Sequence, residues 1–327
     1  MTATTLPQTS NLPVRRLMPG LALSALVSTI LLIAMGSIVR VTGNGLGCPD
    51  WPLCYGRVIP PALTGAWLEF THRLLGGVTS IQILLLAVFA WRSCRHQPRV
   101  YRPAVAAAGL LVVQVSLGGL HVIYEIPPAT GWIHTGVAML IVGLLTVEVG
   151  ATLPALQSLR GATGEIFRNR RFGTWVALTA GATYVLLLTG SYVTRSGASL
   201  ACPSFPMCGS SAPAMRRLID IQMLHRYAAY SVAFLTLMTI VWLLRRQEER
   251  GLARIAYGLG ALLLVQFGLG IANVLLSLPM WSRVLHLTVA ATLWAGLVLL
   301  WSLDYVRQPA ADTRPDAAQT LKVFGNL

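Results

Sequence analysis

The chain has 327 residues, of which 55% are hydrophobic and only 11% are charged, and its mean hydropathy is +0.65. This composition excludes an ordinary soluble globular domain and indicates a protein that crosses a membrane several times. The formal net charge is +14, and whether it reflects a nucleic-acid partner depends on where the basic residues lie.

Eight apolar runs are each long enough, at about 20 residues, to cross the hydrocarbon core of a bilayer as a helix. The sequence therefore predicts an all-α integral membrane protein with eight transmembrane helices. The first run is too long for the core of a signal peptide and lacks a clear cleavage site, so we expect it to remain as a helix. In chain order, the predicted spans are 18–39, 72–91, 104–123, 131–152, 173–193, 223–244, 253–277 and 284–303.

Most basic residues lie in the segments that connect these spans on one side. With the N-terminus in the cytoplasm, 17 of the 25 basic residues fall in segments facing the cytoplasm, which is the positive-inside pattern. The charge therefore indicates membrane topology rather than a nucleic-acid partner, and both termini are predicted to be cytoplasmic. The 17 residues are Arg15, Arg16, Arg92, Arg95, Arg99, Arg102, Arg160, Arg168, Arg170, Arg171, Arg245, Arg246, Arg250, Arg254, Arg307, Arg314 and Lys322.

Four of the five cysteines lie in two long loops that this topology places outside. Cys48 and Cys54 belong to "CPDWPLC", and Cys202 and Cys208 belong to "CPSFPMC". Five residues separate the members of each pair, which is not the short spacing of zinc fingers. On the oxidising side of a membrane, a local disulfide in each loop is favoured over free thiols. Cys94, on the cytoplasmic side, is expected to be a reduced thiol.

The two halves of the chain resemble each other. "GSIVRVTGNGLGCPDWPLC" matches "GSYVTRSGASLACPSFPMC" at an offset of 154 residues. Offsets of 152 or 153 also align His72 with His225, Gln114 with Gln266, and His134 with His286. We predict two duplicated four-helix units with the same orientation in the membrane. The predicted organisation is an N-terminal cytoplasmic segment 1–17, units 18–152 and 173–304, a cytoplasmic linker 153–172 and a cytoplasmic tail 305–327.

Four histidines begin the even-numbered spans, namely His72, His134, His225 and His286. Because all even spans run inward, their imidazoles are expected at similar depth near the outer surface. A single membrane histidine more often ties helices together by hydrogen bonds, but four at duplicated positions indicate ligation. Two imidazoles on different helices in each unit suit a bis-histidine haem. Bare metal sites are disfavoured because few carboxylates or cysteines accompany these histidines.

The two units differ beside their first histidine. Glu69 precedes His72 by three residues and shares its helical face, whereas the counterpart before His225 is Gln222. A carboxylate can take a proton or stabilise positive charge, and an amide cannot. This difference predicts chemistry in the N-terminal unit and a permanent cofactor in the C-terminal unit. The competing interpretation is that Glu69 only orients an imidazole or lies in headgroup water.

Several further residues are candidates for polar contacts near the haems. Arg73 and Arg226 directly follow the first histidine of each unit, so they could hold haem propionates or simply snorkel to water. His121 ends the third span and aligns with Asn273, so we expect it to contact a propionate or a loop rather than iron. Weaker propionate candidates are Arg40, Arg57 and Arg195.

Several motifs, taken together, resemble the haem A synthase family in its cysteine-containing bacterial type. They are "GCPDWPLC", "EFTHRLLGG", "GWIHTG", "CPSFPMC", "MLHRYAAY" and "VLHLTVAATLW", and the resemblance covers residues 18–304. It implies two pseudo-symmetric four-helix bundles and a catalytic glutamate at Glu69. The implied axial ligands are His225 and His286 for a haem b cofactor, and His72 and His134 for the substrate haem. The resemblance also implies disulfides Cys48–Cys54 and Cys202–Cys208, for which redox exchange and a purely structural role both remain open.

The implied reaction oxidises a porphyrin methyl of haem O to a formyl group through two successive hydroxylations, with water as the oxygen source. The product would be haem A for respiratory terminal oxidases, and Glu69 would act as a base or as an electrostatic stabiliser. The expected location is the bacterial inner membrane, with the haem sites near the extracytoplasmic face. Candidate partners, besides haem O and the lipid bilayer, are haem O synthase, an electron acceptor that no motif identifies, and a second copy of the chain. The rival functions are a membrane cytochrome b that transfers electrons without modifying haem, and a haem transporter or assembly chaperone.

Overall fold

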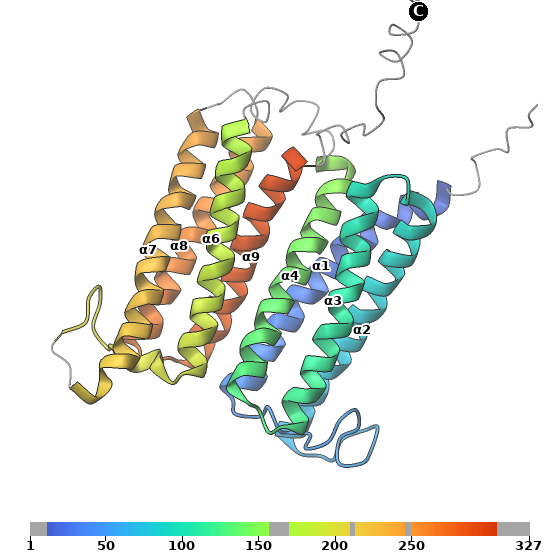
Figure 1. Ribbon diagram of the computed structural model, residues 1–327. Coiled ribbons are helices and arrows are strands. Elements are labelled where there is room, and N and C mark those ends of the chain that lie inside the picture. Colours follow the sequence, from blue (N-terminus) through green and yellow to red (C-terminus); the bar gives the residue numbers. More distant parts are fainter. Residues whose placement is uncertain (1–11, 157–169, 210–212, 246–249, 306–327) are drawn as a thin grey trace, which may run out of the picture.

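The computed structural model describes residues 12–156, 170–209, 213–245 and 250–305. Within these ranges, eight helices are long and apolar enough to cross a membrane, and they are joined by loops, turns and two short 3-10 helices (Figure 1). The predicted all-α membrane fold is confirmed. The long helices are α1 (Leu12–Val41), α2 (Thr64–Cys94), α3 (Pro98–Ile123), α4 (Pro128–Thr152), α6 (Arg170–Arg195), α7 (Arg216–Arg245), α8 (Arg250–Leu275) and α9 (Met280–Tyr305).

The helices are longer than the predicted spans. α2 begins at Thr64, eight residues before the predicted start, and continues through Glu69, His72 and Arg73. The predicted span 72–91 was too short because it followed the apolar run, whereas a helix satisfies its own backbone hydrogen bonds whatever side chains it carries. α1 likewise begins at Leu12, inside the segment predicted to precede the first span.

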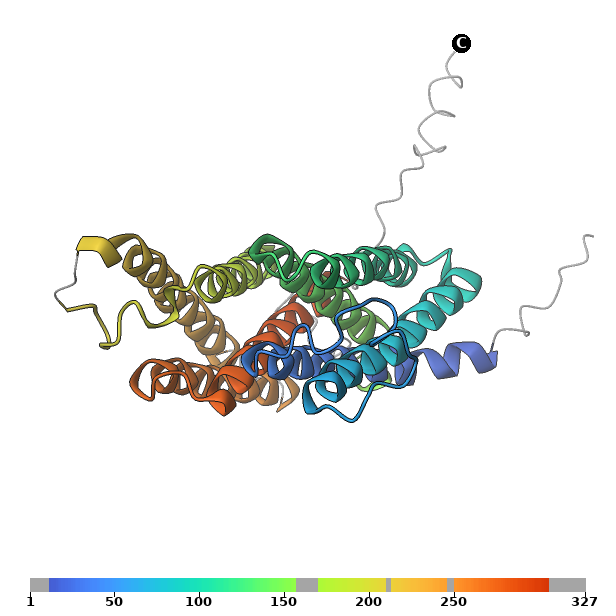
Figure 2. The same ribbon diagram turned by 90° about the horizontal axis from the view of Figure 1, so that it is seen from below.

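The helices pack in two groups of four. In the first group α1 and α3 each contact α2 and α4, and in the second α6 and α8 each contact α7 and α9. The groups meet where α4 packs on α9, α1 on α9 and α6 on α4, which gives the elongated outline seen along the helices in Figure 2. The cysteine loops and the N-terminal ends of α2, α4, α7 and α9 all lie at the same end of the molecule, drawn at the bottom of Figure 1.

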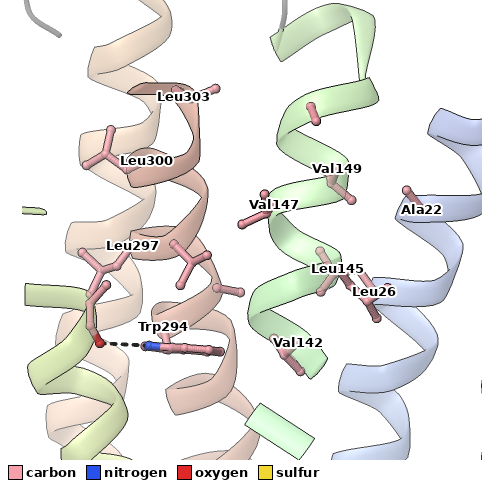
Figure 3. Packing of buried hydrophobic residues seen from close by; sticks show 14 of the residues in the cluster. Ala22, Leu26, Val142, Leu145, Val147, Val149, Trp294, Leu297, Leu300 and Leu303 are labelled. Atoms are coloured by element: carbon pink, nitrogen blue, oxygen red, sulfur yellow. Dashed lines mark hydrogen bonds between the residues drawn. The ribbon is translucent and has the colours of Figure 1, made fainter. Parts of the chain in front are cut away.

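Apolar side chains fill the interface between the two groups. Figure 3 shows residues of α1, α4 and α9 from one continuous cluster of buried residues. The indole N–H of Trp294 donates a 3.0 Å hydrogen bond to the carbonyl of Ala180, so α9 is also tied to α6. The ring of Trp294 packs directly on Gly143 of α4, where any larger residue would overlap it. Small residues allow such close helix contact in lipid, and the contact holds the two groups together.

Two short turns at the same end share an unusual backbone conformation. Ile126, between α3 and α4, has a φ of 63°, and Leu278, between α8 and α9, has a φ of 62°. A non-glycine residue in this region costs about 1–3 kcal/mol. Each turn recovers a backbone hydrogen bond, from Ile126 to the carbonyl of His121 at 2.8 Å and from Leu278 to that of Asn273 at 2.9 Å. The repeat found in the sequence therefore extends to local backbone geometry.

Some predictions fall partly or wholly outside the described residues. They concern positions 1–11 of the N-terminal segment, 157–169 of the linker and 306–327 of the tail. Six of the predicted cytoplasmic basic residues also lie outside the described residues, namely Arg160, Arg168, Arg246, Arg307, Arg314 and Lys322. The side of the membrane on which the termini lie stays a prediction.

Candidate functional site: two pairs of facing histidines

The structure brings the four predicted histidines together as two pairs. His72 of α2 and His134 of α4 are close enough to interact electrostatically in the first group of helices. His225 of α7 and His286 of α9 do the same in the second. All four side chains are partly buried. Their role as iron ligands stays a prediction.

The prediction that the four histidines begin their helices is wrong. They lie six to nine residues after the first residue of α2, α4, α7 and α9, which is about 9–14 Å along each axis. The error follows from the underestimated helix lengths. Because the distance from the helix start to the histidine is similar in all four helices, the imidazoles still lie near one end of the molecule.

Each imidazole packs against a glycine of the preceding long helix. An ideal Cβ built on that glycine would approach the imidazole Cε1 closely, so the absence of a side chain makes room for the ring. From this Cβ position to Cε1, the distance is 2.9 Å for Gly36 and His72 and for Gly190 and His225. It is 3.5 Å for Gly118 and His134 and for Gly270 and His286. The first two sites cannot accept a methyl group without a shift, whereas 3.5 Å is ordinary van der Waals contact.

We expect Gly190→Ala to lower the amount of haem bound to the purified protein several-fold. The added methyl would displace the ring of His225, although alanine is otherwise the better helix former. Absorbance of the reduced haem, normalised to protein, measures the effect. Gly270→Ala is the matched control, because a methyl there only touches His286 at 3.5 Å. Equal haem content in both variants would show that the close glycine contact is unimportant.

The orientation of the imidazoles differs between the pairs. Nδ1 of His225 lies 2.9 Å from the hydroxyl of Thr189, whereas the buried Nδ1 of His72 has no hydrogen-bond partner among the described residues. The hydroxyl of Thr189 donates to the carbonyl of Leu186 and so accepts from Nδ1–H of His225, whereas the aligned residue Met35 has only a weakly accepting thioether. A hydrogen bond to the second ring nitrogen fixes an imidazole for ligation. His225 therefore has a hydroxyl partner that His72 lacks.

Two glutamines contact the second histidine of each pair. The side-chain amide of Gln114 lies 3.0 Å from Nε2 of His134. Gln266 reaches His286 in the same way, at 3.2 Å from Nδ1 and 3.3 Å from Nε2. The sequence showed these glutamines only as landmarks of the repeat, and the structure gives them a contact with the site.

Glu69 and Gln222 make the same contact with the loop preceding their helices. Oε2 of Glu69 accepts a 2.9 Å hydrogen bond from the backbone N–H of Cys48, and Oε1 of Gln222 accepts a 2.6 Å bond from that of Cys202. Glu69 also forms an ion pair with Arg73 at 2.5 Å. Only 4% of Glu69 is exposed, so the interpretation that it lies in headgroup water is wrong. Its oxygens bind the loop and Arg73 rather than His72.

The guanidinium groups of Arg73 and Arg226 bind the cysteine loops. Arg73 donates to the carbonyls of Asp50 at 2.8 Å and Leu53 at 2.7 Å, and Arg226 donates to those of Ser204 and Cys202, each at 2.7 Å. Both guanidinium groups therefore have partners in the protein, and neither simply extends into water. Their predicted contact with propionates stays untested.

Both cysteine loops are closed by the expected disulfides. Cys48 is bonded to Cys54 and Cys202 to Cys208, with Cα–Cα distances of 4.6 and 5.3 Å. Cys94 belongs to neither disulfide, and its sulfur lies 3.8 Å from that of Met18. The structure thus confirms the local pairing in each loop.

A carboxylate further orders the first loop. Asp50 accepts hydrogen bonds from the backbone N–H groups of Gly56 at 2.7 Å and Tyr55 at 2.6 Å. These bonds, the one from Gly56 most of all, lower the pKa of Asp50 below its ordinary value. The loop that reaches Glu69 is thereby fixed by a disulfide, by Asp50 and by Arg73.

A cavity of about 250 Å³ lies among the helices of the second group. Both His225 and His286 line it, together with apolar residues such as Leu187 and Phe267. Within the described residues, no group of three or more His, Cys, Asp or Glu side chains could hold a bare metal ion. Haem iron needs only two axial protein ligands, and its macrocycle is apolar. The residues present therefore fit a bis-histidine haem.

His121 makes a contact that its repeat partner reproduces. Its Nδ1 lies 2.7 Å from the hydroxyl of Thr130, and the amide oxygen of Asn273 accepts a 2.7 Å hydrogen bond from Ser282. Both bonds join the end of one helix to the start of the next. His121 thus ties α3 to α4.

Three residues were missed in the sequence and are notable in the structure. Thr189 could have been found from its alignment with Met35. Arg283, three residues before His286, lines the cavity. Glu148 of α4 is fully buried, and neither carboxylate oxygen has a hydrogen-bond partner among the described residues. An acidic residue inside a predicted span was the available signal.

The fold and the paired histidines define a class of helical membrane protein with two similar sites at one end. A family model described as COX15-CtaA, cytochrome oxidase assembly protein, matches residues 20–69 and 63–298. The chain belongs to this family. It is 30% identical over 256 residues to "Heme A synthase" of Shouchella clausii, covering 76% of this chain and 84% of the relative. The enzyme of the same name from Alkalihalophilus pseudofirmus is 28% identical over 276 residues, covering 83% of this chain and 92% of the relative.

Proposed function

We propose that the protein is a haem A synthase, which converts a methyl group of haem O into the formyl group of haem A. The observation that carries the proposal is the difference between two otherwise matching sites. Glu69 and Gln222 accept equivalent hydrogen bonds from their loops, yet only the first is an acid. Membership of the family supports the same function, since its curated relatives carry that name.

The two units have different tasks in this proposal. In the unit of residues 18–152, His72 and His134 bind the iron of the substrate haem O. In the unit of residues 173–304, His225 and His286 bind a resident haem b. The hydroxyl of Thr189 beside Nδ1 of His225 supports a permanent cofactor there. The unpartnered Nδ1 of His72 suits a substrate that must enter and leave.

The overall reaction removes four electrons from one methyl carbon. Each of two hydroxylations adds an oxygen atom from water and releases two electrons and two protons, and the resulting geminal diol loses water to give the aldehyde. Bound haem b supplies a site for electrons on their way to an external acceptor. The chain contributes a fixed carboxylate, because Glu69 is held between Cys48 and Arg73. In that position it stabilises positive charge on the substrate carbon or accepts a proton from the attacking water.

The location of the sites follows from the same proposal. The positive-inside pattern supports a location of the cysteine loops, and hence of both histidine pairs, near the extracytoplasmic face of the bacterial inner membrane. Disulfides in both loops agree with an oxidising compartment. The partners would be haem O synthase, which supplies the substrate, and an electron acceptor.

A cytochrome b that only conducts electrons across the membrane is the rival function. Such a conduit needs haems near opposite faces, whereas all four histidines lie near the starts of α2, α4, α7 and α9, which are at the same end of the molecule (Figure 1). A conduit also needs no acid at position 69, since the amide of Gln222 makes the same loop contact in the second unit. A haem transporter or assembly chaperone would likewise bind haem without altering it.

Pigment analysis separates these functions. The full chain is co-expressed with a haem O producer, and the extracted haems are identified by mass spectrometry. We expect formyl haem to accumulate, and the control strain that lacks this chain should contain only haem O. Recovery of unchanged haem O from cells that contain the folded protein would support a conduit or a transporter instead.

A further inference from the structure

Three arginines from both groups of helices meet at the C-terminal cavity. Arg40 ends α1, Arg195 ends α6 and Arg283 lies in the first turn of α9, and all three line the cavity that also contains His225 and His286. Arg40 lies close enough to the other two for their positive charges to repel. We call these three residues the arginine cluster.

The arginine cluster has no acidic partner. No ion pair joins any of its members to a carboxylate in the parts of the chain that the structure describes. Arg226, the other arginine on the cavity wall, donates instead to the carbonyls of its loop. Burying three positive charges, even partly, near the end of a membrane bundle costs free energy unless an anion binds beside them. The cavity therefore offers a site for negative charge that the protein itself does not fill.

The cluster also connects the two histidine pairs. Arg40 lies about one helical turn after Gly36, the glycine against which the ring of His72 packs. The guanidinium of Arg195 lies against Gly131 of α4, where it would overlap any side chain, and its charge reaches His134. The anion site thus lies between the N-terminal and C-terminal units, and α1 of the first unit contributes to the cavity of the second.

We propose that Arg40, Arg195 and Arg283 form a carboxylate-binding site that holds the propionates of the porphyrin in the C-terminal cavity. Two imidazoles would bind the iron, the apolar walls would bind the macrocycle, and the guanidinium groups would pair with its two carboxylates. Guanidinium is well suited to this task because it binds carboxylate with two parallel hydrogen bonds. The proposal rests on the proposed function only in taking the resident ligand to be a haem. It makes cofactor retention by the C-terminal unit depend on Arg40 of the N-terminal unit.

Haem retention tests the proposal without measuring enzyme activity. The full chain in detergent micelles is loaded with iron protoporphyrin IX or with its dimethyl ester, in which both propionates are neutral. Transfer to excess apomyoglobin gives the rate of haem loss. We expect Arg40→Gln and Arg283→Gln each to accelerate loss of the acid form roughly tenfold or more, since each removes charge-assisted hydrogen bonds. Loss of the ester should be equally fast from the variants and from the unaltered protein.

The control variant is Arg216→Gln, whose side chain is exposed at the start of α7 and does not line the cavity. It should release both porphyrins as the unaltered protein does. Equal acceleration for acid and ester in Arg40→Gln would mean that the arginine only packs the cavity, and no acceleration would mean that it binds something else. Either result would overturn the proposal yet leave the proposed function standing. Failure of the unaltered chain to bind either porphyrin would instead overturn both.

Discussion

Glu69→Gln is expected to retain its fold and its resident haem while its rate of formyl haem production falls roughly 10²–10⁴-fold, the usual contribution of a positioned acid or base. The substitution is almost isosteric, and the protein already shows that an amide can occupy this position. Gln222 accepts the loop N–H at 2.6 Å in the C-terminal unit, so glutamine at position 69 can keep the bond to Cys48. What disappears is the negative charge of the side chain and its ion pair with Arg73.

The measurement is the ratio of formyl haem to haem O in cells that express comparable amounts of each protein. Glu125→Gln provides the matched control, because Glu125 is an exposed acid in the turn between α3 and α4, at the same end of the molecule. That variant should convert haem O normally. Full activity in Glu69→Gln would remove this residue from the mechanism, and loss of resident haem would show that its role is structural.

His225→Leu should lower the content of resident haem by about tenfold or more, because under the proposed function His225 binds the iron, and removing a ligand should cost at least as much as removing a residue that merely orients one. Leucine is apolar and close in size to histidine, so the contact with Gly190 does not require the helices to separate. The observable is the reduced-minus-oxidised absorbance of the purified protein, normalised to its concentration.

Two variants make this result specific. His72→Leu should retain the absorbance of the resident haem but produce no formyl haem, since it affects the unit assigned to the substrate. His96→Leu changes an exposed residue just after α2, at the opposite end of that helix from His72, and should alter neither signal. If His72→Leu lost the absorbance and His225→Leu kept it, the roles of the two units would be reversed.

Much of the fold could be predicted because few backbone structures are stable inside a membrane. A run of about 20 apolar residues must form a helix in lipid, where no water can satisfy the backbone. The positions of the eight helices followed from this rule, but their ends did not. α2 continues outward past Glu69 to Thr64, because helix length is set by backbone bonding and packing rather than by side-chain hydropathy.

The candidate site could be predicted in part because it is duplicated. The repeat paired His72 with His225 and His134 with His286, and it exposed the difference between Glu69 and Gln222. It could not show what these side chains touch. Arg73, for example, follows a histidine as a propionate ligand would, yet its donors bind the carbonyls of a loop some 20 residues earlier in the chain.

The sequence by itself determined that this protein is helical, crosses the membrane eight times and carries two histidine pairs, because hydropathy and repetition are properties of the chain order. Only the tertiary structure decided that Glu69 is clamped between a loop N–H and Arg73, and that Arg40 of the first unit faces the cavity of the second. The first arrangement depends on how the cysteine loop folds back onto α2. The second depends on how α1, α4, α6 and α9 pack at their interface, where small side chains and Trp294 set the approach of the two units.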